Sequence, residues 1–358
     1  VLLRGHRARL MQAVVLVGGE GTRLRPLTLT QPKPALPLVD RPFIRYMVDW
    51  LGRHGIDEVV MACGFRADDL REALGNEVPG GPSIRYIEEE KPLGTAGPIR
   101  LAADEGLLGD RFMVLNGDSL TDLDLTALQR QHAETGAVIT LGLYPVDDPS
   151  SFGLVRRDDD GVVLGFLEKP DPELIDTDEV SAGAYVIEAR VLELIPPGRA
   201  VSIEREVFPR LVGHGLYGRR LEGYWMDIGT PERYLQASWD ILEGRVETEL
   251  AGDGGPFVED GAEIDPGATV ERRAVVRSGS AVAEDALIAD SVLLDGCRVG
   301  EGAEVRGSIL AAGVRVGAGA TIGSETVIGA GATVDPGVTV ARGSRIQPEE
   351  VVEAEVTA

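Results

Sequence analysis

Apolar and polar positions alternate in two distinct ways along this chain, and the first way covers about the first 250 residues. Short apolar runs predict strands at residues 13–17, 57–63, 83–87 and 111–115. Amphipathic stretches between them predict helices at residues 42–54, 67–74 and 95–104. Beyond residue 131, strands become more frequent, at residues 138–144, 154–157, 162–167 and 184–187. The pattern predicts an open α/β sheet covered on both faces, with an added lobe.

The second pattern begins near Gly254 and repeats every six residues. Aliphatic side chains occupy Val258, Ile264, Val270, Val276, Val282, Ile288 and Leu294, then Val316, Ile322, Ile328, Val334, Val340 and Ile346. Between the two series the step shortens twice to five, through Val299, Val305 and Leu310. This period is typical of hexapeptide parallel β-helices, in which the aliphatic residues fill a triangular coil. A disordered linker would have no reason to keep such series in phase.

Histidine positions limit what the repeat does. Hexapeptide helices also occur in acyltransferases that use a histidine base, but the histidines here are His6, His54, His132 and His214, all outside the repeat. We therefore interpret the repeat as structural, capping or oligomerising the protein.

The stretch from Gln12 to Leu38 carries the strongest candidate chemistry. Its apolar strand opens into Gly18, Gly19, Glu20 and Gly21, where missing Cβ atoms let the backbone turn sharply and approach a ligand. A strand that runs into such a loop predicts a phosphate cradle. The glycine spacing fits neither a P-loop nor the dinucleotide fingerprint.

Cations follow this loop. Arg23 and Arg25 come first, and Lys33 then stands between Pro32 and Pro34. Because both prolines fix φ, the backbone beside Lys33 is stiff. Such a site is suited to holding charge against a triphosphate.

Charge and cysteine content narrow the class of partner. The formal net charge of -24 argues against general binding to nucleic acids or anionic membranes, so an anionic nucleotide needs local cations and a metal. Only Cys63 and Cys297 are present, which indicates neither a disulfide framework nor a zinc site and suits a reducing cytosol. No stretch approaches the roughly 20 apolar residues of a membrane span. We expect residues 1–11 to be a poorly ordered leader.

The string GGEGTRLRPLT, followed by PKPALPLVDRPFI, resembles the signature of the sugar-nucleotide pyrophosphorylases. These nucleotidyltransferases join a sugar 1-phosphate to a nucleoside triphosphate. The resemblance spans residue 12 to about residue 245 and continues more weakly through the repeat. It implies a Rossmann-like, open mixed-sheet nucleotidyltransferase domain at residues 12–250, followed by a left-handed parallel β-helix at residues 254–350.

Two aspartates are the metal-ligand candidates. Asp118 follows an apolar strand, at the carboxyl edge where open α/β sheets bind ligands, and Asp227 precedes a turn and a helix. Two such carboxylates suit Mg²⁺, which takes oxygen ligands together with substrate phosphates. The resemblance implies that Asp118 and Asp227 hold Mg²⁺, that Arg23 neutralises developing charge, and that Lys33 holds the nucleotide or the leaving pyrophosphate. Arg23, Lys33 and Asp118 are thus the predicted catalytic residues.

The base is suggested by residues 87–97, which resemble the EEEPLGTAG stretch of the mannose-1-phosphate guanylyltransferases. Guanine has two adjacent hydrogen-bond donors, and one ionised carboxylate can accept a hydrogen bond from each. Glu89 is therefore the candidate residue for recognition of the base. The strings SIEREVFP (202–209) and GYWMDIGTP (223–231) favour the same subfamily. The predicted nucleotide-binding residues are Leu16, Gly18, Gly19, Gly21, Thr22, Arg23, Glu89, Gly94 and Thr95.

The sugar side is indicated by FLEKP, residues 166–170, which resembles the family's E-K-P element. Glu168 would accept sugar hydroxyls and Lys169 would bind the sugar phosphate. The predicted sugar-phosphate set is Gly153, Glu168, Lys169, Ser181 and Gly183. Because Ser181 stands where the family usually has Asn, the sugar itself stays open.

These observations predict a cytoplasmic enzyme that makes GDP-mannose and pyrophosphate from GTP and mannose 1-phosphate with Mg²⁺. A glucose-1-phosphate thymidylyl- or uridylyltransferase is the alternative within the class. A non-catalytic regulatory relative that binds sugar nucleotides is the alternative outside it, although Arg23, Lys33, Asp118 and Asp227 all being present argues against it. We expect homo-oligomers formed through the β-helix, and no nucleic-acid or membrane partner.

Overall fold

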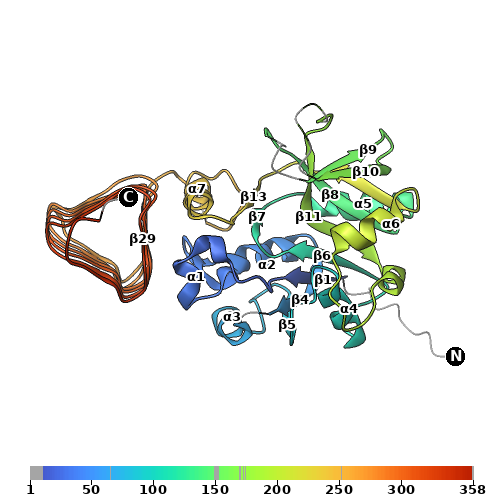
Figure 1. Ribbon diagram of the computed structural model, residues 1–358, viewed down its shortest axis with the longest axis horizontal. Coiled ribbons are helices and arrows are strands. Elements are labelled where there is room, and N and C mark those ends of the chain that lie inside the picture. The colour runs from blue at the N-terminus through green and yellow to red at the C-terminus, as the bar shows by residue number, and fades with distance from the viewer. Residues whose placement is uncertain are drawn as a thin grey trace. The chain divides into compact units, whose positions relative to one another are not determined.

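The structure is a computed structural model that describes residues 11–64, 66–148, 153–168, 171, 173, 175–250 and 252–356 (Figure 1). The chain divides into two compact units. The first takes in Val1–Gly19 and Met47–Trp225, and the second takes in Glu20–Tyr46 and Met226–Ala358. The sequence predicts that one domain ends at residue 250 and that the next begins at residue 254, where the six-residue repeat starts. These limits stay a prediction.

A mixed sheet forms the centre of the first unit. Among the described residues it has nine strands, in the order β10-β9-β11-β6-β1-β4-β5, with β8 pairing β11 and β12. Strands β1, β4, β5 and β6 pair in parallel, whereas β11 is antiparallel to β6, β8 and β9. The strands are β1 (Met11–Leu16), β4 (Ile56–Cys63), β5 (Ser83–Glu88), β6 (Arg111–Asn116), β8 (Ile139–Pro145), β9 (Gly153–Arg157), β10 (Val163–Glu168), β11 (Glu179–Glu188) and β12 (Leu216–Arg220).

Helices α2 (Phe43–Arg53), α3 (Ala67–Leu74), α4 (Gly97–Asp104), α5 (Leu125–Thr135) and α6 (Phe208–Leu211) accompany these strands, with a short β7 (Ser119–Thr121) and a π-helical turn at Ile203–Val207. Asp124 caps α5 by accepting a hydrogen bond from the Ala127 amide at 2.9 Å. The central strands read as nearly continuous apolar runs because both faces are buried, as at Val14, Val60 and Val114. The prediction of a Rossmann-like α/β domain is confirmed.

The strand and helix predictions hold within two residues in this unit, with one exception. Strand β11 begins at Glu179, whereas the sequence predicted a strand only from residue 184. Its pairing with β8 shifts register between Ser181 and Tyr185, and Gly183 there has a φ of 69°. This irregularity breaks the apolar alternation from which the strand was predicted. Strand β1 begins at Met11, the last residue of the expected leader, and residues 1–10 lie outside the described part of the chain.

The repeat folds into three parallel ladders of two- and three-residue strands, as expected of a left-handed β-helix (Figure 1). The first ladder is β14 (Phe257–Val258), β17 (Val275–Val276), β20 (Val292–Leu293), β23 (Ile309–Leu310), β26 (Val327–Ile328) and β29 (Arg345–Ile346). The second is β15 (Glu263–Ile264), β18 (Ala281–Val282), β21 (Arg298–Val299), β24 (Arg315–Val316), β27 (Thr333–Val334) and β30 (Val351–Val352). The third is β16 (Thr269–Val270), β19 (Leu287–Ala289), β22 (Glu304–Arg306), β25 (Thr321–Ile322) and β28 (Thr339–Val340).

One interior position differs from the prediction. Leu293, and not Leu294, aligns with Val276 and Leu310 and joins the apolar core of the coil. The five-residue step therefore falls at the corner after Ile288. There Asp290 has a φ of 50°, and the Ser291 hydroxyl donates to the Ala289 carbonyl at 2.7 Å. A tighter corner closed by a buried serine accounts for the missing residue.

Four outward-facing residues of the first ladder are buried, and helix α7 contacts this β-helix through two arginines. Val275, Val292, Ile309 and Val327 point away from the coil interior yet are fully buried. Helix α7 (Pro231–Leu242) is tied to this β-helix by Arg345 to Glu232 at 3.3 Å and by Arg273 over the Trp239 ring at 5.4 Å. The unit also holds α1 (Leu27–Thr30), β2 (Pro37–Leu38), β3 (Arg41–Pro42) and 3-10 turns at Thr22–Leu24 and Lys33–Ala35. Strand β13 (Trp225–Asp227) begins at the last residue of the first unit and continues in the second. Within the described residues, no helix is both long and apolar enough to cross a membrane.

Candidate active site

Asp227, in β13, is surrounded by cations in the second unit. Arg233 in the first turns of α7 donates to its Oδ2 at 3.1 Å, Lys33 Nζ lies 3.8 Å from its Oδ1, and Arg23 Nη2 lies 3.9 Å from Oδ2. The Lys33 side chain is 9% exposed, whereas that of Arg23 is 63% exposed. Lys33 is therefore fixed in place, and the Arg23 guanidinium is available to an incoming anion.

Two glycines make this cluster sterically accessible. A Cβ on Gly229 would lie 2.6 Å from Arg23 Nη2, so a side chain there would displace the arginine. Gly21 has a φ of 62°, and a Cβ there would lie 3.1 Å from Lys33 Cβ. Gly21 favours glycine because its φ is positive, and a side chain at position 229 would push the exposed end of Arg23 aside. Arg25, from the same loop, pairs instead with Glu20 at 3.3 Å.

The Asp227 carboxylate is well suited to bind a metal ion. Its Oδ1 is buried and makes no hydrogen bond with the residues that the structure describes, although Lys33 is near. A buried, unsatisfied carboxylate oxygen is the type of ligand that a hard divalent cation uses. Over the described residues, no three His, Cys, Asp or Glu side chains gather as a metal site. The donors therefore fit a cation held by few carboxylates together with substrate oxygens.

Asp118, the other predicted metal ligand, lies in the first unit just beyond β6. Its charge contributes to raising the pKa of the Tyr185 hydroxyl, although burial is the larger cause. Because Asp118 and Asp227 belong to different units, their sharing one metal stays a prediction.

The glycine loop meets Glu89 in the first unit. A Cβ on Gly18 would lie 2.9 Å from Glu89 Oε1, so glycine allows the carboxylate to approach the loop. Glu89 Oε2 accepts a hydrogen bond from the Leu93 amide at 2.7 Å. Burial raises the pKa of Glu89, and the Leu93 bond only partly opposes this shift. Two predicted nucleotide-binding residues, Gly18 and Glu89, are thus side by side. The Leu16 carbonyl at the end of β1 accepts from the Gly117 amide at 2.9 Å, which ties the loop's strand to the turn before Asp118.

Gly94 and Thr95 are held against residues 201–204. A Cβ on Gly94 would lie 2.5 Å from the Val201 carbonyl oxygen, and φ at Gly94 is 72°. Thr95 Oγ1 accepts from the Ile203 amide at 2.9 Å and donates to Glu204 Oε2 at 2.7 Å. The predicted nucleotide loop is therefore hydrogen-bonded to the π-helical turn that carries Glu204.

A cavity of about 480 Å³ is lined in part by Glu204 and Arg205 of that turn. Two residues of the predicted sugar set, Gly153 and Ser181, line it; its other lining residues are Asn116, Val155, Phe166, Val180, Tyr185, Ser202, Glu204, Arg205 and Phe208. Gly183 packs against Asn116 of this lining, since a Cβ there would lie 2.7 Å from the Asn116 side-chain nitrogen. Phe208 stacks on Phe166 and meets Tyr185 edge to face, which gives the cavity an aromatic wall. Polar and aromatic lining of this kind fits a sugar.

The remaining predicted site residues include Lys169, Glu168, Thr22 and Gly19. Lys169 lies outside the described residues, and Glu168 ends β10 with a side chain that the structure does not describe. Thr22 begins the 3-10 turn that also carries Arg23, and a Cβ added to Gly19 would meet no atom within 4 Å among the described residues. Their roles stay predictions.

Sequence reasoning missed several site residues. Glu204 and Arg205 lie inside the string 202–209, and Arg233 lies two residues beyond the string 223–231, but no individual role was assigned to any of them. Asn116 precedes Asp118 in the same turn, and Tyr185 sits in a strand read only as apolar. Spacing gave no signal for the Tyr185 and Glu204 contacts, because they depend on the tertiary fold.

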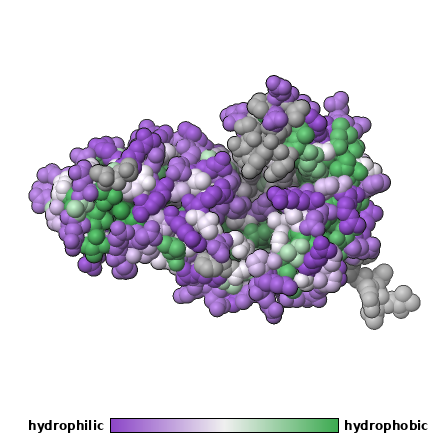
Figure 2. All heavy atoms as spheres, in the orientation of Figure 1, coloured by the Kyte–Doolittle hydropathy of each residue, from purple (hydrophilic) through white to green (hydrophobic). Residues whose placement is uncertain are grey.

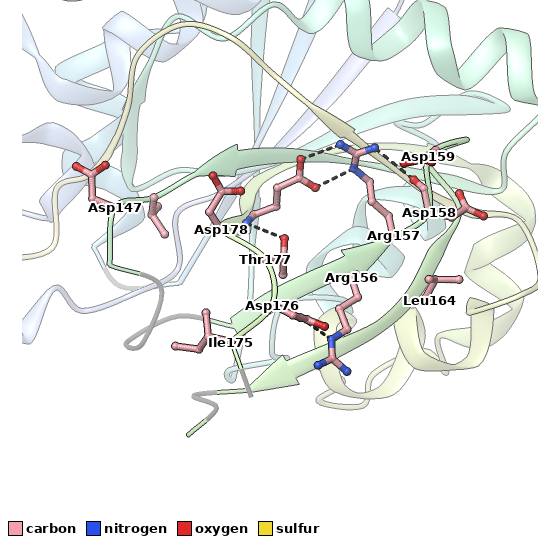
Figure 3. Close-up of a pocket in the computed structure, with 12 residues that line it drawn as sticks. Asp147, Arg156, Arg157, Asp158, Asp159, Leu164, Ile175, Asp176, Thr177 and Asp178 are labelled. Carbon is pink, nitrogen blue, oxygen red and sulfur yellow. Dashed lines mark hydrogen bonds and ion pairs between the residues drawn. The ribbon is translucent and has the colours of Figure 1, made fainter. Parts of the chain in front are cut away.

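A second cavity, of about 740 Å³, lies beside β9 and β11 and holds none of the predicted site residues (Figure 3). Both of its arginines are paired with acidic neighbours in the lining: Arg157 with Glu179 at 2.8 Å and Arg156 with Asp176 at 2.8 Å (Figure 3). Its other charged lining residues are all aspartates, which would repel an anionic substrate, so we assign it no role.

Comparison with protein families gives two matches. The nucleotidyl transferase family model matches residues 12–244, and the GMPPB C-terminal domain model matches residues 253–358.

Curated relatives and solved structures agree with these matches. A mannose-1-phosphate guanylyltransferase of Mycobacterium tuberculosis is 40% identical over 292 residues, which cover 80% of this chain and 80% of the relative. A probable mannose-1-phosphate guanylyltransferase 2 of Arabidopsis thaliana is 37% identical over 272 residues, 72% of this chain and 74% of the relative. The crystal structure of HddC from Yersinia pseudotuberculosis complexed with GMP-PN is 26% identical, with a TM-score of 0.55, and covers 64% of this chain and 98% of that chain. This chain therefore belongs to the nucleotidyl transferase family and, within it, to the mannose-1-phosphate guanylyltransferases.

Proposed function

We propose that this enzyme transfers the guanylyl group of GTP to mannose 1-phosphate, giving GDP-mannose and pyrophosphate. The observation that carries the proposal is the cluster of Arg23, Lys33 and Arg233 around Asp227. A triphosphate brings several negative charges to a chain whose net charge is -24, so local cations of this kind are needed for it to bind. The names of the relatives supply the base and the sugar.

The reaction needs positioning and charge stabilisation, and no protein nucleophile. An oxygen of the sugar phosphate forms a bond to the α-phosphorus of GTP, and the bond from that phosphorus to the β-phosphate oxygen breaks. The electron pair leaves with pyrophosphate. Arg23, which is 63% exposed, neutralises charge on the reacting phosphates, and the fixed Lys33 holds the triphosphate and then the leaving group.

Members of this family typically use a divalent metal, and we propose Mg²⁺ held by Asp118 and Asp227. When bound, Mg²⁺ would supply positive charge to phosphate oxygens. The buried Oδ1 of Asp227 is the atom in this structure that supports the assignment. Arg233 orients the same carboxylate through its bond to Oδ2.

Recognition of both substrates is assigned to residues of the first unit, with Gly21 and Thr22 added from the second. Glu89 would accept the two adjacent donors of guanine, with Leu16, Gly18, Gly19, Gly21, Thr22, Gly94 and Thr95 as the further nucleotide-binding residues. The 480 Å³ cavity would hold the sugar through Ser181, Gly153 and Glu204. Glu168, Lys169 and Gly183 complete the proposed sugar-phosphate set.

We further propose a cytoplasmic enzyme that self-associates through the β-helix. Figure 2 shows hydrophobic residues gathered on the part of the β-helix that faces the viewer. Val258 and Val351, from its first and last strands, are 41% and 55% exposed. Apolar surface of this type favours association with a second copy.

The decisive experiment measures pyrophosphate release from GTP, dTTP, UTP, ATP and CTP, each with mannose, glucose or N-acetylglucosamine 1-phosphate. We expect the highest kcat/KM with GTP and mannose 1-phosphate, and we expect EDTA to abolish it until Mg²⁺ is restored. Preference for dTTP or UTP with glucose 1-phosphate would replace the guanylyltransferase assignment. Folded protein without activity on any pair would favour a regulatory relative.

A further inference from the structure

Val39 adopts a left-handed backbone conformation, with a φ of 56°, and is 1% exposed. Together with Asp40 it turns the chain between β2 and β3, whose paired residues are Leu38 and Arg41. A β-branched residue is strained at positive φ, and hairpin turns normally place glycine, asparagine or aspartate there. Contacts from outside the turn must therefore hold Val39 in this conformation.

Arg277 of the β-helix supplies such a contact. Its Nη1 donates to the Val39 carbonyl oxygen at 3.1 Å, although the two residues are far apart in sequence. The Arg277 side chain is itself fixed between two carboxylates, with Glu259 at 3.3 Å from Nε and Asp295 at 3.6 Å from Nη2. Only 12% of the side chain is exposed, so the guanidinium has little freedom to move.

Backbone hydrogen bonds connect this hairpin to Lys33. The Phe43 amide, just after β3, donates to the Leu36 carbonyl at 2.8 Å, and the Leu36 amide donates to the Lys33 carbonyl at 3.1 Å. Tyr234 of α7 donates its hydroxyl hydrogen to the Pro37 carbonyl. A shift of the hairpin would thus be passed through two hydrogen bonds to the turn that places Lys33 beside Asp227.

We propose that Arg277 is a positioning residue for nucleotidyl transfer: by binding the Val39 carbonyl it holds the strained hairpin and, through it, the Lys33 ammonium. The β-helix then takes part in the reaction, beyond any role in self-association. This inference rests on the proposed function of Lys33. Arg277 should therefore affect the binding of the triphosphate and leave the binding of the sugar phosphate unchanged.

The test replaces Arg277 by methionine, which keeps an unbranched stem and removes the guanidinium. Arg315→Met is the matched control, because Arg315 is an exposed arginine on the outer face of β24. We expect Arg277→Met to lower kcat/KM for GTP about tenfold, with the KM for mannose 1-phosphate unchanged within about twofold. Arg277→Lys, which keeps one donor, should lose less, and it serves as the variant if Arg277→Met does not fold.

A rescue experiment separates positioning from a general loss of structure. Glycine adopts a φ of 56° without strain, so Val39→Gly should make the hairpin independent of Arg277. The double variant should therefore recover most of the GTP activity that Arg277→Met loses. Equal losses for both substrates without rescue, or wild-type kinetics in Arg277→Met, would overturn the proposal.

Hydrogen exchange tests the contact between Arg277 and the hairpin independently of the enzyme's activity. Amides of residues 38–41 should exchange faster in Arg277→Met than in wild type or Arg315→Met. If the wild-type chain makes no GDP-mannose, the proposed function fails, and the exchange rates still decide whether Arg277 holds the hairpin. Unchanged exchange at residues 38–41 would overturn that role.

Discussion

The ammonium nitrogen of Lys33 lies 3.8 Å from Oδ1 of Asp227, although the two residues come from opposite ends of the nucleotidyl transferase region. That oxygen is buried and accepts no hydrogen bond from the described residues. Lys33 is therefore close enough to balance the charge of the Asp227 carboxylate, while Oδ1 is still able to bind a metal ion. Three basic residues around one carboxylate give the site an excess of positive charge.

Replacing Lys33 by methionine should lower kcat/KM for GTP by about 100-fold or more, since the buried cation that we propose holds the triphosphate is lost. Steady-state kinetics with GTP varied at saturating mannose 1-phosphate would measure the loss. Arg25→Met is the control from the same loop, because Arg25 pairs with Glu20 and not with Asp227. Equal losses in the two variants would contradict a specific role for Lys33.

Arg233→Met should lower kcat by about tenfold, because Asp227 would lose the hydrogen bond that orients its Oδ2. Arg233→Lys should recover part of the rate, since an ammonium provides charge without the planar guanidinium geometry. Rates measured across a Mg²⁺ series would locate the defect. Wild-type kcat in Arg233→Met at every metal concentration would remove Arg233 from the site.

Recognition of guanine should depend on pH through Glu89. Burial raises the pKa of its carboxyl group, so the protonated form persists to higher pH than for an exposed glutamate. Only the ionised form accepts both guanine donors, and the KM for GTP should therefore rise as pH falls through that raised pKa. Glu89→Gln should abolish this dependence and narrow the preference for GTP over UTP and dTTP. A pH profile of kcat/KM for GTP that is identical in the variant and wild type would exclude Glu89 as the reader.

Sugar selectivity should depend on Glu204, which lines the 480 Å³ cavity and binds Thr95. Glu204→Gln should lower kcat/KM for mannose 1-phosphate about tenfold, since an ionised acceptor of hydroxyl groups is lost. Selectivity for mannose over glucose 1-phosphate should fall with it. Glu206→Gln is the matched control, because Glu206 is exposed on the same turn. Loss of selectivity in both variants would point to disruption of the turn.

The alternation of inward- and outward-facing residues in the β-helix can be tested at two adjacent positions. Ile322 points into the coil and is 1% exposed, whereas Thr321 points outward and is exposed. Ile322→Ala should cost about 2–5 kcal/mol of unfolding free energy, from lost burial and a cavity, and Thr321→Ala should cost less than about 0.5 kcal/mol. Chemical denaturation followed by circular dichroism would compare them. Similar costs would contradict the inward and outward alternation.

The sequence alone was sufficient for the elements whose signal is periodic. Strands such as β4 and β6 contain unbroken apolar runs, and the interior aliphatic residues of the β-helix recur every six residues except at two steps of five. Leu294 shows where such reasoning ends. Adjacent leucines at 293 and 294 are chemically equivalent, and only the buried Ser291 corner decides which of them enters the coil.

What the tertiary structure decided is which distant side chains meet. Sequence indicated Lys33, Asp227 and Glu89 one at a time, each by its own local motif. It gave no sign that Arg233 binds Asp227, that Glu204 binds Thr95, or that Arg277 of the repeat binds the Val39 carbonyl. A periodic pattern reports local conformation and the face that is buried, because both repeat along the chain. A hydrogen bond between remote residues depends on how whole elements pack, and no local pattern records that packing.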